Sequence, residues 1–189
     1  QINAHLDRYN AKDKNIIVIG GGDTGSDCIG TCNRHGAGSV VNFELSHKPG
    51  KNRDSSNPWP YWPFTLKTTS SHQEGVSREW SILTKKFTGD KNNNLIGLET
   101  VNVEIDKITG KLTEIPNSKK TWKCDMVILA LGFTGPEVAL PNLLDIDMDN
   151  RGNISSNSDY QTKKNNIFTA GDCRRGQSLI VWAISEGRE

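Results

Sequence analysis

Residues 15–25, NIIVIGGGDTG, carry the strongest indication of how this chain folds. The first part of this stretch, residues 15–19, is β-branched and apolar, which predicts a buried strand, and its glycines predict a tight turn. Residues 26–35 then predict a helix that ends near residues 36–38, and residues 40–45 predict a second strand. A strand, a glycine turn, a helix and a second strand form a βαβ unit, which indicates an α/β protein with a parallel sheet.

Three glycines in that turn, Gly20, Gly22 and Gly25, have the G-x-G-x-x-G spacing of dinucleotide-binding loops. The first permits the tight turn, the second lets a pyrophosphate approach the backbone, and the third lets the helix pack close to the strand. The free N–H groups and the positive dipole end of the helix then face the phosphates. Asp23 and Thr24 stand at the helix start, where they either cap the free N–H groups or contact the cofactor. The turn therefore predicts a Rossmann-like site for NAD(P)H.

Glu44 ends the second predicted strand, about 20 residues after the third glycine. An acid at this place accepts hydrogen bonds from an adenosine ribose diol, and its charge repels a 2′-phosphate, so it favours NADH over NADPH. Four basic residues just downstream oppose that preference, namely His47, Lys48, Lys51 and Arg53. We therefore expect NADH to be only slightly preferred.

The middle of the chain changes from the βαβ pattern to an antiparallel one. Residues 46–64 interleave four prolines with aromatic residues, which predicts an ordered loop because so many aromatic side chains need a surface to pack on. Residues 95–105 and 112–115 alternate apolar and polar side chains around a turn at 106–111, which predicts a hairpin. Residues 121–123 predict a further strand, so this part predicts an antiparallel β-meander.

The last third of the chain carries a second glycine motif. Residues 125–131 predict a buried strand that ends at Gly132. Residues 167–170 predict a short strand that delivers Gly171 and Asp172 to a turn. In flavoproteins with two dinucleotide-binding domains, such an acid contacts the ribityl chain of FAD, and the alternative is an ordinary surface turn.

The segment after this turn predicts a helix. It begins near residues 176–179, so Gln177, Ser178 and Leu179 form its start. Because the N-terminus of a helix presents free N–H groups to a ligand, we expect this start to face the flavin.

Charge and composition exclude several classes of function. The 189 residues hold 23 Lys and Arg against 22 Asp and Glu, a formal net charge of +1. With both signs scattered along the chain, no basic field favours nucleic acid or a membrane surface, and no run reaches the ~18 apolar residues that span a bilayer. The four cysteines are too few for a disulfide scaffold and indicate free thiols in a reducing compartment. We therefore expect a cytoplasmic protein.

Two side-chain pairs imitate active sites. Cys28 and Cys32 lie four residues apart on the first predicted helix, but that spacing strains a disulfide, so core packing explains them better. Tyr160 and Lys164 match the Y-x-x-x-K pair of short-chain carbonyl reductases, yet they lie in a polar, turn-rich stretch, and the chain lacks that family's glycine loop. The histidines and acids do not have the spacing of metal ligands. We predict neither a metal site nor a catalytic side chain.

Longer stretches resemble one family, the small subunit (beta chain) of glutamate synthase or the corresponding C-terminal region of a fused NAD(P)H-dependent glutamate synthase. The similar stretches include two narrow motifs, NPWP and RRGQSLIVWAISEGR, and are residues 15–32, 57–64, 84–91, 126–138 and 170–189. The resemblance implies an NAD(P)H-binding domain, residues 1–125, inserted in an FAD-binding domain of the two-dinucleotide-binding-domain flavoprotein type. Residues 126–189 would be the C-terminal part of that FAD domain, so we expect a fragment with only part of it.

The resemblance also implies a function and partners. Such an enzyme passes a hydride from NAD(P)H to FAD, and then electrons through Fe–S clusters to an FMN site, where glutamine and 2-oxoglutarate yield glutamate. This chain would be the electron-input region, inactive by itself, and the Fe–S clusters and FMN would lie in missing or partner regions. The partner would be the large glutaminase/FMN subunit or the rest of a fused chain. The cofactor-binding residues would be Gly20, Gly22, Asp23, Thr24, Gly25, Glu44, Gly132, Gly171, Asp172, Gln177, Ser178 and Leu179.

Hydride transfer requires the nicotinamide to stack on the flavin and does not require a side-chain acid or base, which is why no catalytic residue is assigned. Three alternatives stay open at this point. The chain is another NAD(P)H-dependent flavin oxidoreductase, a nucleotide-binding fragment without turnover of its own, or a carbonyl reductase that uses Tyr160 and Lys164.

Overall fold

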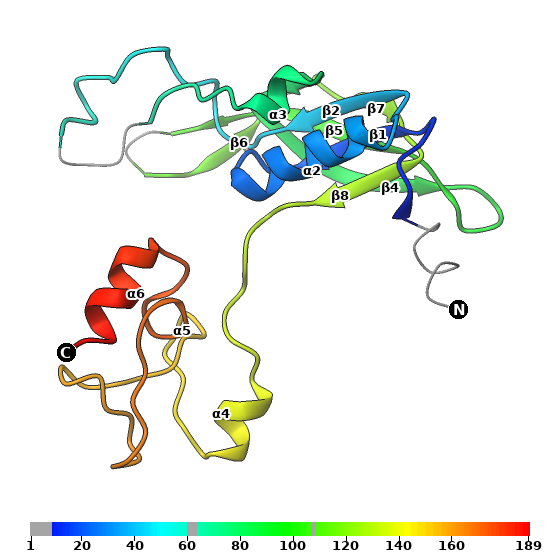
Figure 1. Ribbon diagram of the computed structural model, residues 1–189. Helices are drawn as coiled ribbons and strands as arrows, with labels where there is room; N and C mark the ends of the chain where they lie inside the picture. The colour runs from blue at the N-terminus through cyan, green and yellow to red at the C-terminus, as the bar shows by residue number, and fades with distance from the viewer. Residues whose placement is uncertain (1–8, 60–63, 107–108) are drawn as a thin grey trace. The chain divides into compact units, whose positions relative to one another are not determined.

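Two units make up the structure, a computed structural model that describes residues 9–59, 64–106 and 109–189. Contacts between residues divide the chain into Gln1–Leu131 and Gly132–Glu189 (Figure 1). The first unit contains two sheets, and the second consists of short helices joined by long loops.

The first unit contains the predicted βαβ unit. Strand β1 (Asn15–Ile19) leads into helix α2 (Asp23–Arg34), and strand β2 (Ser39–Phe43) pairs with β1 in parallel. The parallel sheet has the order β3–β2–β1–β8, with β3 at Ser77–Glu79 and β8 at Met126–Leu129. The βαβ prediction is confirmed, and the helix begins at its glycine turn rather than at residue 26.

The second sheet of this unit is antiparallel. Strand β5 (Leu95–Ile105) pairs with β4 (Ile82–Gly89), β6 (Leu112–Glu114) and β7 (Lys120–Lys123). The predicted hairpin and meander are confirmed, while residues 107–108 of the hairpin turn lie outside the described residues. Sequence patterns missed β4, because its centre carries lysines and is largely exposed.

The predicted loop at 46–64 contains no helix or strand over its described residues, 46–59 and 64. The expectation that its aromatic side chains are packed is wrong for Trp59, which is 82% exposed. Two further aromatic residues of the motif, at positions 61 and 62, lie outside the described residues.

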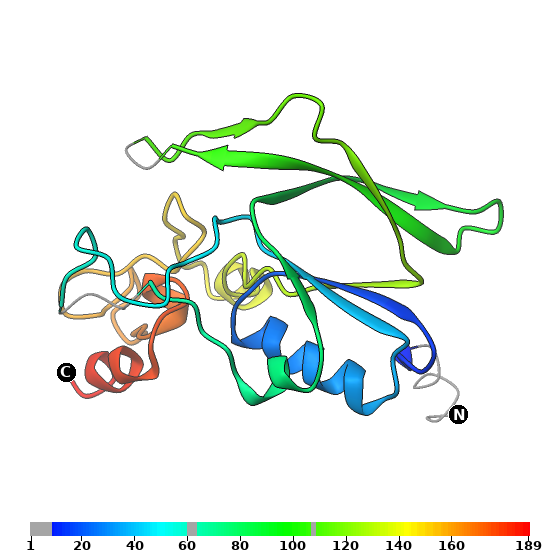
Figure 2. The same ribbon diagram turned by 90° about the horizontal axis from the view of Figure 1, so that it is seen from above.

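Each face of the parallel sheet packs on a different layer, as the view in Figure 2 shows. Alternate side chains of β1 point to opposite faces, because successive residues of a strand alternate. Ile16 and Val18 pack with Ile29 of α2 on one side. Ile17 lies on the other side with residues of both sheets, namely Phe43, Ile82, Leu98 and Cys124. The carboxyl ends of β1 and β2 are thereby fixed beside the start of α2.

Strand β8 corrects two expectations. It covers Met126–Leu129 rather than residues 125–131, and it is only partly buried, with Leu129 61% exposed, because it lies at the edge of the parallel sheet. Since β8 pairs with β1, it belongs to the first unit, which ends at Leu131. The assignment of the two parts to NAD(P)H and FAD stays a prediction.

The second unit has three short helices and no strand of its own among its described residues. They are α4 (Ala139–Leu143), α5 (Asp172–Arg175) and α6 (Ile180–Glu186). The strand predicted at 167–170 is wrong, since only an isolated bridge joins Gln161 to Phe168. The helix predicted to begin near residues 176–179 begins at Ile180.

Candidate functional site

The glycine turn after β1 is held by close backbone contacts. Gly20 has φ +120°, a conformation that favours glycine, and a Cβ there would lie 2.1 Å from the carbonyl oxygen of Ala130. A Cβ at Gly25 would lie 2.1 Å from the carbonyl oxygen of Gly20. A Cβ at Gly22, by contrast, meets nothing within 4 Å. Two glycines are thus required by the fold, whereas the third leaves open space beside the turn.

The turn leads directly into the N-terminus of α2. Gly22 is the N-cap residue, and no side-chain hydrogen bond caps the helix. Asp23 and Thr24 lie in the first turn and are exposed, so the structure does not use either of them as the cap. The first N–H groups of a helix have no partner within it, so this end offers donors to an anion.

Glu44 follows β2 directly and reaches over the glycine turn. A Cβ at Gly21 would lie 2.2 Å from Oε2 of Glu44. Oε1 accepts a hydrogen bond from Nη2 of Arg78, in β3, at 2.8 Å. The side chains of Glu44 and Arg78 are only 12% and 13% exposed. The predicted acid therefore lies at the turn, but it is already ion-paired.

A cavity of about 190 Å³ joins these groups. Its other wall comes from Phe64 to Lys67, Thr69 and His72. Thr69 Oγ1 lies 2.6 Å from Ser26 Oγ of helix α2 and 2.9 Å from Nδ1 of His72. These contacts connect the wall to the helix that carries the glycine turn.

His72 is buried in this wall, in the short helix α3 (Ser70–Gln73). Its Nδ1 accepts a hydrogen bond from the Thr69 N–H at 3.1 Å, whereas Nε2 has no hydrogen-bond partner within the described residues. Burial lowers the pKa of His72 and the nearby Arg78 lowers it further, although Glu44 acts in the opposite direction. The surroundings therefore favour the neutral form of this imidazole, which lines the cavity, and its Nε2 is buried.

Sequence patterns singled out neither Arg78 nor Thr69 nor the buried position of His72. Arg78 lies in a three-residue strand, which is too short to produce a periodic pattern. The sequence TSSH at 69–72 does carry the Ser/Thr cap preference, and the structure forms a capping box between Thr69 and His72. The capping pattern at 69–72 could therefore have predicted helix α3. It could not have predicted that Thr69 contacts Ser26 beside the glycine turn.

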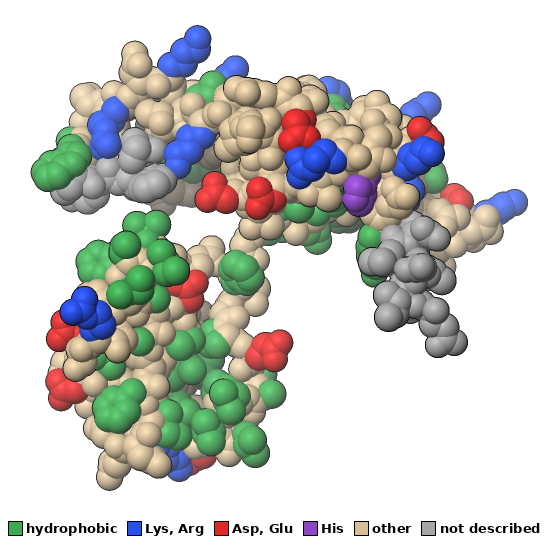
Figure 3. Space-filling view, in the orientation of Figure 1, with side chains coloured by type: hydrophobic (Ala, Val, Ile, Leu, Met, Phe, Trp, Pro, Cys, Tyr) green, Lys and Arg blue, Asp and Glu red, His purple; other side chains and the backbone are tan. Residues whose placement is uncertain are grey.

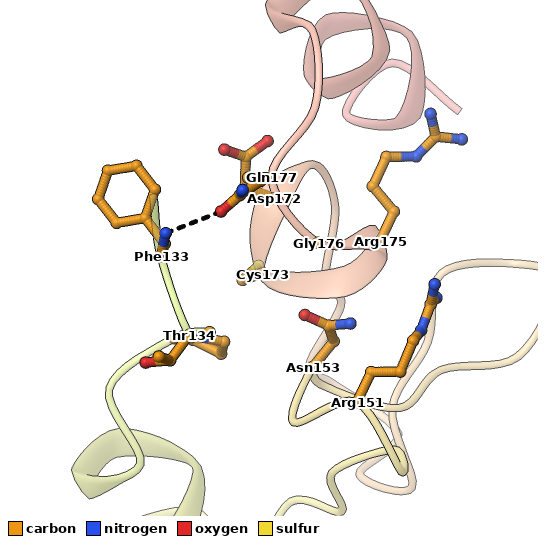
Figure 4. A pocket seen from close by; sticks show the side chains of 11 residues that line it. Phe133, Thr134, Arg151, Asn153, Asp172, Cys173, Arg175, Gly176 and Gln177 are labelled. Atoms are coloured by element: carbon orange, nitrogen blue, oxygen red, sulfur yellow. Dashed lines mark hydrogen bonds between the residues drawn. The ribbon is translucent and has the colours of Figure 1, made fainter. Parts of the chain in front are cut away.

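The second unit contains a separate cavity of about 510 Å³ (Figure 4). Figure 4 shows Phe133 and Thr134 on one side, facing Asn153, Arg151 and Arg175 on the other. Two predicted residues, Gly132 and Gln177, lie close together beside this cavity. The Phe133 N–H donates to Oε1 of Gln177 at 2.9 Å, and a Cβ at Gly132 would lie 2.9 Å from Nε2 of Gln177. Asp172 lines the same cavity and accepts from the Ser178 N–H at 3.2 Å.

The predicted helix start at Gln177 is wrong. Helix α5 follows Gly171 directly, and Gly176, with φ +85°, ends it before α6 begins at Ile180. Gln177 therefore lies in the connection between two helices, and its side chain contacts the backbone of Phe133 instead. Leu179, the N-cap of α6, is exposed and is not among the residues that line the cavity.

Glu186 holds the turn that carries Asp172. Its side chain is 4% exposed, and Oε2 accepts from the N–H of Gly171 at 2.7 Å. Oε1 lies 3.1 Å from Arg174 Nη1 and 2.7 Å from Arg175 Nε. Burial raises the pKa of Glu186, but the Gly171 bond and the two guanidinium groups outweigh it and leave the pKa below its ordinary value. Helix α6 is thereby tied to the turn by an ionised carboxylate.

The side-chain pairs that imitate active sites have other partners. Tyr160 stacks under the guanidinium of Arg174, at 4.6 Å, while Nζ of Lys164 lies 2.9 Å from Asp145. Cys28 and Cys32 are free thiols, and burial raises the pKa of each. Core packing accounts for the two cysteines, and contacts with Arg174 and Asp145 account for Tyr160 and Lys164.

Residues 9–59, 64–106 and 109–189 contain neither a membrane-spanning helix nor a group of metal-ligating side chains. None of the helices there has the length and apolar character needed to cross a bilayer. A grouping of three or more His, Cys, Asp and Glu side chains suited to a metal ion is also absent from those ranges. Apolar side chains gather on the surface of the second unit (Figure 3). The exposed ones are Phe133, Val138, Leu140, Leu143, Leu144, Phe168, Leu179, Ile180, Val181, Trp182 and Ile184.

A parallel sheet with a glycine turn at the carboxyl end of β1 defines a nucleotide-binding α/β protein. Residues 2–187 match the pyridine nucleotide-disulphide oxidoreductase family. The chain belongs to this family.

Within this family, the chain is similar to glutamate synthases. The chain is 48% identical over 189 residues to "Glutamate synthase [NADH]" of Schizosaccharomyces pombe, and the aligned region covers 95% of this chain and 9% of that protein. It is 41% identical over 188 residues to "Glutamate synthase [NADPH] small chain" of Bacillus subtilis, covering 95% of this chain and 38% of that one. The chain thus spans well under half of these relatives, and the resemblance to glutamate synthases is confirmed.

A solved structure has the same fold. Thioredoxin reductase of T. acidophilum superposes with a TM-score of 0.64 over 97% of this chain and 52% of that chain, at 20% sequence identity. The predicted fold class, an α/β fold of the two-dinucleotide-binding-domain flavoprotein type, is confirmed by this similarity and by the family match.

Proposed function

We propose that this chain is the electron-input region of a glutamate synthase, where a hydride passes from NAD(P)H to FAD. The observation that carries the proposal is the open space at Gly22 beside the uncapped N-terminus of α2. Backbone N–H groups there suit a pyrophosphate, and a Cβ at Gly22 would occupy the same space. The family match and the similarity to glutamate synthases support this assignment.

The proposed nucleotide is NADH in preference to NADPH. Glu44 presents Oε2 at the glycine turn, where a carboxylate accepts hydrogen bonds from a ribose diol and repels a phosphate. His72 lines the same cavity. When bound, the nucleotide supplies the hydride, and the residues of this chain orient it.

The proposed flavin contacts lie in the second unit. Asp172 and Gln177 line its cavity with Arg151 and Arg175, so the cavity offers both acceptors and cationic donors. Glu186 fixes the turn before Asp172 through the Gly171 N–H. These groups suit the hydroxyl and phosphate groups of FAD, which would supply the electron acceptor, and they bind and orient it without a proton transfer.

The proposed partner is the large subunit of glutamate synthase or the rest of a fused chain, where the Fe–S clusters and FMN would lie. Relatives named as small chains and relatives named as whole enzymes both match the same region. The exposed apolar residues of the second unit suit contact with further protein, because such patches mark interaction surfaces. We propose a cytoplasmic location, and we expect no turnover from residues 1–189 alone.

Anaerobic addition of NADH to the intact protein is expected to bleach the flavin absorbance, because the hydride reduces FAD. Titration with NADH and, separately, with NADPH measures this directly. A protein whose flavin is reduced by neither nucleotide would overturn the proposal. Tyr160→Phe serves as the matched control, because it is expected to leave reduction unchanged, whereas a carbonyl reductase that uses Tyr160 would lose its turnover.

A further inference from the structure

Arg78 is fixed in one orientation beside the glycine turn. Its Nη2 bonds to Glu44 at 2.8 Å, and its Nη1 donates to the carbonyl of Lys67 at 2.8 Å. The guanidinium centre lies 5.0 Å from the centroid of the Trp80 ring, within cation–π range. A carboxylate, a carbonyl and an aromatic face together leave the guanidinium little freedom.

The pair of Arg78 and Glu44 is not explained by packing. Both side chains are nearly buried, and taking two charges out of water carries a large desolvation cost. Neither residue belongs to the two apolar clusters of the first unit. Both line the cavity beside the glycine turn. The pair therefore lies where a ligand bound in this cavity would meet it.

The two oxygens of Glu44 have different surroundings. Oε1 is bonded to Arg78, while Oε2 lies against Gly21 of the turn. A carboxylate that is fixed through one oxygen can accept hydrogen bonds from vicinal hydroxyl groups at the other. Because Nη1 and Nη2 of Arg78 each have a bond already, the guanidinium must first lose Glu44 before it can bind a phosphate in the bidentate manner.

We propose that Arg78 sets the nucleotide preference through Glu44, as a positioning residue. The contact holds the carboxylate at the ribose position, and the same contact keeps the guanidinium from a 2′-phosphate. This inference rests on the proposed binding of a nicotinamide nucleotide at the glycine turn. It assigns the discrimination between NADH and NADPH to the ion pair rather than to the charge of Glu44 alone.

Binding of NAD⁺ and NADP⁺ to the intact protein tests the inference without any hydride transfer. Arg78→Met is expected to weaken NAD⁺ binding about tenfold, since one charge-assisted contact no longer orients Glu44. Glu44→Gln is expected to weaken NAD⁺ binding about as much and to strengthen NADP⁺ binding about tenfold, because the guanidinium is released to the phosphate. In the double variant, NAD⁺ binding should fall no further than in Glu44→Gln, and the gain for NADP⁺ should disappear.

Two results would overturn the inference. One is a loss of NAD⁺ affinity from Arg78→Met that is as large in the Glu44→Gln background as in the wild type, because Arg78 would then touch the nucleotide itself. The other is a Glu44→Gln protein without improved NADP⁺ affinity. If the wild type binds neither nucleotide, the proposed function fails instead.

Control variants keep these results interpretable. Arg34→Met removes an arginine from the exposed pair with Glu74 and is expected to leave both affinities unchanged. Should Arg78→Met fail to fold, Arg78→Lys retains the charge with a single ammonium group. It should give intermediate NAD⁺ affinity, and unchanged affinity for both nucleotides would count against the inference.

Discussion

Replacing Glu186 with Ala is expected to lower the free energy of unfolding of the second unit by about 2–3 kcal/mol. The substitution removes the acceptor of the Gly171 N–H and leaves Arg174 and Arg175 without their shared carboxylate. The main cost is the buried Gly171 N–H left without an acceptor, because the two guanidinium groups are partly exposed to water. The turn that carries Asp172 should loosen with it.

Hydrogen exchange of the Gly171 amide in the intact protein measures this effect where it arises, and exchange of the amides of α6 follows unfolding of the same unit. Glu137→Ala, which removes an exposed acid of this unit, should change stability by less than about 0.5 kcal/mol. Equal exchange rates at Gly171 in the wild type and the Glu186→Ala protein would contradict the assigned role.

The pH dependence follows from the same carboxylate. The pKa of Glu186 is lower in the folded state than its unfolded value of about 4.3, so the folded state binds its proton less readily. This contribution to stability is present above the unfolded pKa and is lost as the pH falls through the folded pKa. Acid titration should therefore expose the Gly171 amide in the wild type, whereas Glu186→Gln should lack this component.

Gly22→Ala is expected to weaken nucleotide binding about 100-fold, equivalent to about 2.7 kcal/mol, with little change in stability. Its Cβ would enter the open space beside the turn and keep the pyrophosphate from the N–H groups of α2. With φ −79° and ψ −173° the backbone at this position accepts any residue, so the loss of a glycine N-cap should cost below about 1 kcal/mol.

Binding of NAD⁺ by calorimetry, together with thermal unfolding, separates the two effects. Gly89→Ala is the matched control, because its Cβ would make only an ordinary contact of 3.4 Å with the Asn94 carbonyl oxygen, in the antiparallel sheet. Gly20→Ala should behave in the opposite way and destabilise the fold, since its Cβ would overlap Ala130. Undiminished NAD⁺ affinity in Gly22→Ala would mean that the nucleotide does not approach the turn.

Patterns that are local in the sequence proved reliable. The βαβ unit and the hairpin were predictable because each needs only a run of β-branched or alternating residues and glycines nearby. The run at 167–170 misled because an apolar run does not tell whether a neighbouring strand exists to pair with it. The run at 125–131 does form a strand, but its burial was overestimated because only β1 pairs with it. In the structure β8 is an edge strand, and Phe168 forms only an isolated bridge.

The glycine turn, the helix that follows it and the acid at the end of β2 can be predicted from the amino-acid sequence, because backbone conformation and strand periodicity depend on nearby residues. The residues that surround them come together through tertiary packing. Glu44 meets Arg78 across 34 positions, Ser26 meets Thr69 across 43, and Gly171 meets Glu186 across 15. These residues are far apart in the sequence, and no periodic pattern relates them. Their contacts orient Glu44, connect the cavity wall to α2 and hold the turn before Asp172, and they form only when the strands and helices pack together.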